Sequence, residues 1–259
     1  SNDEIGELAR YFNTFVSKLK NLQEVEQREV ELQLRDAQMN ALQAQINPHF
    51  LYNTLETIRF MIAMKDNRAM KIVQYLADLF RISIGKGERY VKIRRELEHV
   101  QLYISIQKMR YSNRFTVHYD IDEEVYELYT LKFILQPIVE NTIHHGFELI
   151  ESGGIITIRA RCKDDRLIIS VQDNGSGISA KQLRELQDQL ENKIQAHGVG
   201  LVNVYKRIHL HFGDDYTVSI QSKVNEGTTV TLVMPVLKTQ PSSLSFKRKS
   251  SGKLLLSAI

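Results

Sequence analysis

RLIISVQDNGSGI, residues 166–178, is the stretch that decides the fold of the second half of the chain. Its first eight residues largely alternate apolar and polar side chains, as a strand buried on one face does, and Asp173-Asn174-Gly175-Ser176-Gly177 follows. Glycines at this spacing let a backbone turn sharply and approach a ligand closely. Turns commonly contain Asp, Asn and Gly, so this motif alone predicts only a loop at the end of a strand.

The segments around it complete a mixed pattern of strands and helices. Four further strands are predicted by alternation, at 115–121, 154–162, 216–222 and 227–236. A buried helix is predicted at 131–148, a polar helix at about 180–193, and a helix opened by glycine at 198–213. Helices among mainly antiparallel strands predict an α+β class, with a two-layer α/β sandwich over 113–237.

The first part of the chain reads as helix. Apolar residues step by four and three in one stretch and by seven in the next: Leu8, Phe12, Phe15, Leu19, Leu22, then Val25, Leu32, Met39 and Ile46. This spacing is typical of a coiled-coil seam with a shift in register. One helix cannot bury such a seam alone, so we expect a homodimer.

QINPHFLYNTLE, residues 45–56, interrupts this helix with a proline, which removes a backbone donor. Beyond Pro48, the polar residues His49, Asn53 and Glu56 share one helical face. Two more helices are predicted at about 68–84 and 95–111, and Met61, Met64 and Met70 are expected in the core. An apolar stripe is predicted on the opposite face of the first helix, formed by Leu51, Leu55, Ile58 and Ile62.

Composition narrows the class of protein. The 259 residues carry a formal net charge of +3, and the tail after Leu237 contains five Lys or Arg and no acidic residue. Without that tail the balance is slightly negative, so the charge gives no reason to expect nucleic acid binding. No run reaches the roughly 18 apolar residues of a membrane helix, so we expect these residues to be soluble. The single Cys162 predicts a reduced, structural thiol.

Two further motifs carry polar or phosphate-binding chemistry. Glu140-Asn141 precedes His144 and His145 by one turn, and an amide oxygen is a ligand suited to Mg²⁺. The histidine pair alternatively indicates a transition-metal site, although no third ligand has obvious spacing. Gly198-Val199-Gly200-Leu201 opens a helix, where backbone amides approach phosphate.

Taken in order, these motifs resemble a known family. ENTIHHG, DNGSGI, GVGL and EGTTVTLVMP are similar to the N, G1 and G2 boxes and closing strand of the Bergerat (GHKL) ATP-binding fold. That fold is shared by gyrase, Hsp90, MutL and histidine kinases. NPHFLYNTL resembles the dimerisation helix of LytS/YesM-type sensor histidine kinases, and DEIGELARYFNTF resembles the last helix of a HAMP linker.

The resemblance implies four segments. These are the end of a HAMP-like helix at 1–22, coiled-coil and phosphotransfer helices at 23–112, a catalytic ATP-binding domain at 113–237 and a basic, disordered tail at 238–259. It also implies a sensor and membrane spans upstream, so the chain would be the cytoplasmic portion of a bacterial membrane protein.

Residue by residue, His49 would be the phosphoacceptor, with Pro48 bending the helix beside it. Asn53 matches a position that directs water for dephosphorylation, and Glu140 would polarise the reacting groups. Asn141 would hold Mg²⁺ on the ATP phosphates.

The remaining residues implied by the family bind nucleotide. Asp173 would accept a hydrogen bond from the adenine amino group, in a pocket shaped by Gly175 and Gly177. Gly198 and Gly200 would end the ATP lid, and Thr228 would support the adenine side. Arg207 would contact phosphate or brace the lid, and His145 would lie among the nucleotide-binding residues.

Two departures from the family pattern bear on function. Phe50 follows His49 where many histidine kinases have a carboxylate, which leaves Glu56, Asn53 or a carbonyl to orient the imidazole. Pro137 occupies the position of the water-activating glutamate in hydrolytic members of the fold. The sequence therefore predicts a protein-histidine kinase that autophosphorylates His49 and phosphorylates a response regulator. The alternatives are a nucleotide-binding signalling scaffold and a chaperone-like or topoisomerase-like ATPase.

Overall fold

The computed structural model of the protein describes residues 48–83, 88–112, 114–191, 200–213, 215–241 and 253–258. The chain divides into two compact units, Ser1–Arg59 and Phe60–Ile259. The coiled-coil and HAMP-like segments expected before residue 48 lie outside the described residues. No helix in the described ranges is long and apolar enough to cross a bilayer.

Among the residues that the structure describes, three long helices come first. Helix α2 spans Pro48–Ala63, α3 spans Arg68–Ser83, and α4 spans Ile93–Arg110. At the start of α3, Oδ1 of Asp66 accepts a hydrogen bond from the Arg68 backbone N–H at 2.9 Å, which satisfies one of the free donors of the first turn. The predicted bend at Pro48 falls at the edge of the described residues, where α2 begins with proline in its first turn.

The predicted apolar stripe of α2 is wrong in part. Ile58 is buried, but Leu55 is 51% and Ile62 is 63% exposed, while Met61 is buried. Met64 and Met70, which we expected in the core, are also exposed. Apolar side chains occur on more than one side of this helix, and periodicity does not determine which side is covered.

A two-stranded sheet links segments that the sequence assigned to different domains. Strand β1, Tyr90–Lys92, pairs antiparallel with β3, Tyr129–Leu131. A short 3₁₀ helix, η1, at Glu123–Glu127 precedes β3. Strands of three residues are too short to show a period of two, so the sequence did not indicate them.

The main sheet has six strands in the order β2-β4-β5-β7-β6-β8. Their bounds are Phe115–Ile121, Gly154–Lys163, Arg166–Asp173, Gly227–Pro235, Thr217–Lys223 and Lys253–Ala258, respectively. The three central pairings, β4 with β5, β5 with β7 and β7 with β6, are antiparallel, whereas β2 and β8 run parallel to their neighbours at the two edges. The turn between β4 and β5 consists of Asp164 and Asp165, both with positive φ, as a tight hairpin requires.

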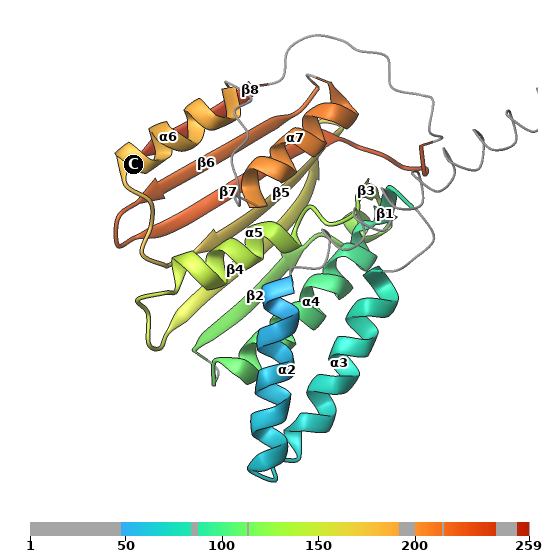
Figure 1. Ribbon diagram of the computed structural model, residues 1–259. Coiled ribbons are helices and arrows are strands. Elements are labelled where there is room, and N and C mark those ends of the chain that lie inside the picture. Colours follow the sequence, from blue (N-terminus) through green and yellow to red (C-terminus); the bar gives the residue numbers. More distant parts are fainter. Residues whose placement is uncertain are drawn as a thin grey trace, which may run out of the picture. The chain divides into compact units, whose positions relative to one another are not determined.

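Helices cover one face of this sheet. Figure 1 shows α5 (Gln136–Asn141), α6 (Ala180–Glu191) and α7 (Gly200–Phe212) on the same side. The core between the layers is aliphatic and includes Ile138, Val139, Ile156, Ile158, Ile169, Val171, Val202, Ile208, Ile220 and Leu232. The predicted α+β two-layer sandwich is thus confirmed.

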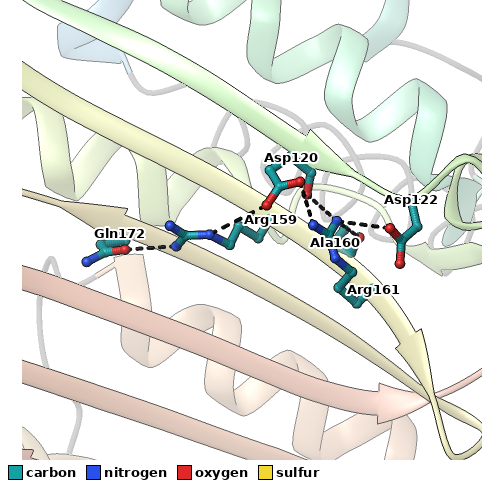
Figure 2. Close-up of polar contacts among 6 residues, drawn as sticks. All are labelled: Asp120, Asp122, Arg159, Ala160, Arg161 and Gln172. Carbon is teal, nitrogen blue, oxygen red and sulfur yellow. Dashed lines mark hydrogen bonds and ion pairs between the residues drawn. The ribbon is translucent and has the colours of Figure 1, made fainter.

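Charged residues join edge strand β2 to β4 and β5 (Figure 2). Asp120 accepts a hydrogen bond from Arg161 at 2.5 Å and lies 3.8 Å from Arg159, which donates to Gln172 at 2.8 Å. Arg161 also pairs with Asp122 at 3.2 Å. These side chains are substantially exposed, so the network contributes little to stability and chiefly keeps the edge strand polar.

Two segments differ from their predicted structure. The helix predicted at 131–148 begins only at Gln136 and continues from Asn141 as a π-helical turn, η2, at Thr142–Gly146. Phe133, with a φ of +60°, reverses the backbone before it. The tail expected to be disordered contains β8, because a run of three leucines can pair with the open edge of β6.

Candidate functional site

Asp173 ends β5 and lies almost fully buried. Its Oδ1 accepts hydrogen bonds from the backbone N–H groups of Gly175 at 2.9 Å and Thr228 at 3.1 Å. Its Oδ2 accepts one from the Thr142 hydroxyl at 3.1 Å. Burial raises the pKa of this carboxyl, and the three donors partly oppose that shift. A buried carboxylate with a fixed orientation can accept a further hydrogen bond from a planar amino group.

The two predicted pocket glycines are required by space. A Cβ on Gly175 would lie 2.4 Å from the carbonyl oxygen of Gly146. Gly177 has a φ of +66°, and a Cβ there would lie 2.0 Å from the carbonyl oxygen of Lys223. The loop after β5 therefore passes closely between η2 and the end of β6, as no larger residue would allow.

Thr228 lies at the start of β7, beside this loop. Its Oγ1 is 2.8 Å from Oγ of Ser222, which also accepts a hydrogen bond from the Ile178 backbone N–H at 2.8 Å. Ser222 thus joins the strand that bears Thr228 to the end of the glycine loop. Thr142, Ser222 and Gly146 belong to this site although the sequence analysis gave them no role. Thr142 and Gly146 lie within the ENTIHHG motif, which was the available signal for these two.

Asn141 is the last residue of α5, where the α-helix passes into the π-helical turn. Such turns widen a helix locally and are frequent at functional sites. Its Nδ2 atom is buried and has no hydrogen-bond partner among the described residues. Gly200 leaves room beside it, since a Cβ there would lie 3.6 Å from that nitrogen and 3.2 Å from Cβ of Pro137. An unpaired amide N–H can donate to an acceptor such as a phosphate oxygen, while a cation would be held by Oδ1 of the same amide.

Glu140, His144 and His145 lie near Asn141 but have other surroundings. Burial is the main cause that raises the pKa of the Tyr103 phenol on α4, and the nearby charge of Glu140 raises it further. His145 is exposed and His144 half-buried. No three His, Cys, Asp or Glu residues in the described ranges lie close enough together to hold a metal ion, so the alternative of a transition-metal site has no support there.

Arg207, on α7, contacts the turn before α5. Its guanidinium donates hydrogen bonds to the carbonyl oxygens of Lys132, at 2.5 Å, and Phe133, at 3.2 Å. It therefore braces the turn before α5. Gly198 lies outside the described residues.

His49 lies in the first turn of α2, and its ring is exposed. Nδ2 of Asn53, one turn later, is 3.0 Å from Nε2 and 3.2 Å from Nδ1 of His49. Glu56 forms an ion pair with Arg59 at 2.7 Å. Of the two side chains considered for orienting the imidazole, Asn53 makes a direct contact with it.

Comparisons with known protein families match most of the chain. Residues 37–115 match the family described as histidine kinase, and residues 128–238 match the histidine kinase-, DNA gyrase B- and HSP90-like ATPase family. Known relatives include "Sensor protein LytS" of Staphylococcus epidermidis, which is 36% identical over 86% of this chain and 37% of its own length. "Sensor histidine kinase YesM" of Bacillus subtilis is 35% identical over 91% of this chain and 39% of its own length.

"Sensor histidine kinase BtsS" of Escherichia coli is 35% identical over 78% of this chain and 34% of its own length. The chain thus spans less than two fifths of each of these three relatives. Among solved structures, the histidine kinase domain of the blue-light activated kinase from Erythrobacter litoralis matches with a TM-score of 0.44 and 17% identity. That match covers 79% of this chain and 96% of the kinase domain.

Proposed function

Because this chain belongs to the LytS/YesM-type sensor histidine kinase family, we propose that it binds ATP with Mg²⁺, autophosphorylates His49 and passes the phosphoryl group to an aspartate of a response regulator. The observation that carries the proposal is the buried Asp173 carboxylate, fixed by three donors in a glycine-lined loop. The chain would be the cytoplasmic portion of a longer membrane sensor, in keeping with its share of its relatives' length.

In this site Asp173 would accept a hydrogen bond from the adenine amino group, with Thr228 and the glycine loop forming the wall of the pocket. Gly200, at the start of α7, would let the triphosphate approach a helix N-terminus. The Asn141 side chain would hold Mg²⁺, which when bound neutralises charge on the phosphates. Phosphoryl transfer depends on this positioning and charge neutralisation more than on covalent help from the protein.

At the phosphoacceptor, the nucleophile is a ring nitrogen of His49 that carries a lone pair. Its exposure on α2 leaves the imidazole accessible to a phosphate donor. Asn53 would restrain the ring through its amide group. It would thus take the role of the carboxylate that many histidine kinases have at the position of Phe50. Pro137 at the position of the hydrolytic glutamate favours transfer to histidine over transfer to water.

We further propose a homodimer. Helices α2 and α3, here called the helical pair, expose large apolar side chains in and beside them, among them Phe60, Ile62, Met64, Met70 and Val73. Several large apolar side chains left exposed on two neighbouring helices support burial of these helices against a second chain.

Incubation with ATP labelled at the γ-phosphate tests the main proposal. Wild type should acquire an acid-labile, base-stable label, and His49→Gln and Asn141→Ala should not. A receiver domain added to the labelled wild type should remove the label from His49. If nucleotide binds but His49 stays unlabelled, the nucleotide-binding scaffold is the function, and Phe50 in place of the usual carboxylate is the observation that favours it.

A further inference from the structure

The backbone that leads into α5 is held by one buried carboxylate. Oε2 of Glu96, on α4, accepts a hydrogen bond from the Phe133 N–H at 2.9 Å. Its Oε1 accepts hydrogen bonds from the N–H groups of Ile134 at 2.7 Å and Leu135 at 3.0 Å. Glu96 is 1% exposed and Phe133, Ile134 and Leu135 are buried. Glu96 therefore pairs three donors that would otherwise be buried without a partner.

Arg207 of α7 holds the other polar groups of the same turn. It donates to the carbonyl oxygens of Lys132 and Phe133, while Glu96 accepts from the N–H groups that follow. Two oppositely charged side chains on separate helices thus hydrogen-bond to one turn of backbone, in which Phe133 has positive φ. Hydrogen bonds to ionised groups are stronger than those between neutral groups, so these contacts strongly restrict the backbone conformation of the turn.

The turn and Asn141 are linked by a short, stiff path. Helix α5 begins at Gln136, directly after the turn, and its six residues end at Asn141. Gly200, at the other end of α7 from Phe212, packs against Pro137 in the first turn of α5 and lies beside the Asn141 amide. The helix is therefore held from α4 and α7 at its start and bounded by α7 near Asn141.

We propose that Glu96 and Arg207 are positioning residues for Asn141, which set the place of its amide relative to the metal-bearing phosphates. This inference rests on the proposed function, in which Asn141 holds Mg²⁺. In this proposal neither Glu96 nor Arg207 needs to touch the nucleotide. Both act through the turn at 132–135 and helix α5.

A role in folding alone would have a different signature. Loss of a purely structural contact lowers the stability of the chain but leaves the folded fraction with its normal magnesium dependence. Loss of a positioning contact raises the magnesium concentration that nucleotide binding needs, and leaves nucleotide binding in EDTA unchanged.

The experiment measures binding of a fluorescent, non-hydrolysable ATP analogue to the full chain, in EDTA and across a magnesium titration. The variants are Glu96→Gln, which keeps the shape of the side chain, and Arg207→Lys, which keeps the charge but loses the two-pronged donor. Matched controls are Glu98→Gln on α4 and Lys206→Gln on α7, both exposed. A thermal unfolding curve of each variant is used to choose a temperature for the binding measurement at which that variant is folded.

We expect Glu96→Gln and Arg207→Lys each to raise the half-maximal magnesium concentration by about tenfold, and the controls to leave it unchanged. The double variant should raise the half-maximal magnesium concentration by less than the product of the two single fold-changes, since both residues hold one turn. Folded variants with the magnesium dependence of wild type would overturn the inference. If Glu96→Gln does not fold, Arg207→Lys alone decides. Wild type that binds the analogue equally with and without Mg²⁺ would instead refute the magnesium role of Asn141, and the inference with it.

Discussion

Oδ1 of Asp173 accepts the backbone N–H of Thr228 at 3.1 Å, so one carboxylate joins the end of β5 to the start of β7. The same oxygen accepts the N–H of Gly175. The proposed adenine pocket is thus built around a group whose position is fixed by neighbouring backbone rather than by the nucleotide. This arrangement makes its contributions to folding and to binding separable.

Asp173→Asn should weaken ATP binding without unfolding the chain. An amide keeps an oxygen for the two backbone donors, and it removes a buried charge whose pKa burial has raised. Stability at neutral pH should therefore be unchanged or higher, while ATP affinity falls by about ten- to a hundredfold through loss of a hydrogen bond to a charged group. Calorimetric titration with ATP and with inosine triphosphate, which lacks the amino group, checks this. An Asp173→Asn chain that still prefers ATP over inosine triphosphate as wild type does would contradict the role of Asp173.

Gly177→Ala should destabilise the chain far more than Gly153→Ala. Both glycines have positive φ, but a Cβ on Gly153 meets nothing within 4 Å, whereas one on Gly177 meets the Lys223 carbonyl. Backbone strain alone costs about 1–2 kcal/mol, and the steric clash should bring the cost at Gly177 above about 3 kcal/mol. Urea unfolding measures both, and equal losses would show that the close approach of the loop to β6 does not matter.

His99 should make stability depend on pH. Burial, together with the charge of Lys132, lowers its pKa from 6.5 to about 4. Between these values the unfolded chain binds a proton that the folded chain does not. Stability is therefore full above about pH 6.5 and falls as the pH drops toward 4, by about 3 kcal/mol in total.

Urea unfolding between pH 7.5 and 4.5 should show this slope in wild type and a shallower one in His99→Gln. His118→Gln serves as the control, because His118 is exposed on β2. Glu96, also buried on α4, is present in all three proteins and cancels in the comparison. Identical slopes for wild type and His99→Gln would remove His99 as the source.

A charge on the exposed apolar surface of the helical pair should break the proposed dimer. Ile62→Glu and Met70→Glu place a carboxylate where association would bury it without a partner, which costs several kcal/mol. Light scattering should show a dimer for wild type and a monomer for these variants. Leu149→Glu is the control, since Leu149 is 83% exposed but lies in the loop after η2. Dimers that survive both helix substitutions would place the interface elsewhere.

The sequence alone was sufficient for the order of the longer helices and of five strands of the main sheet, although not for β1, β3 and β8. Alternation of side chains predicted β2, β4, β5, β6 and β7, because a period of two is a local property of a half-buried strand. Gly175 and Gly177 could be singled out from their spacing in a turn motif, and the structure shows that only glycine fits there. The roles of Asn141, Asp173, His49 and Asn53 were predicted from the resemblance of their motifs to the family, and they stay predictions.

Tertiary structure decided what depends on residues distant in the chain. Nothing local marks Ser222 or Thr142 as partners of the glycine loop, or separates the buried Met61 from the exposed Met64 and Met70. The resemblance predicted that Arg207 contacts phosphate or braces the lid, and nothing local indicated that its guanidinium binds carbonyl groups 74 and 75 residues earlier in the chain. In the sequence Glu96 is one of several charged residues of α4, and only the folded structure shows that it is buried against three N–H groups. Local periodicity and motif spacing determine which elements form, whereas burial and long-range hydrogen bonding decide which polar groups they bring together.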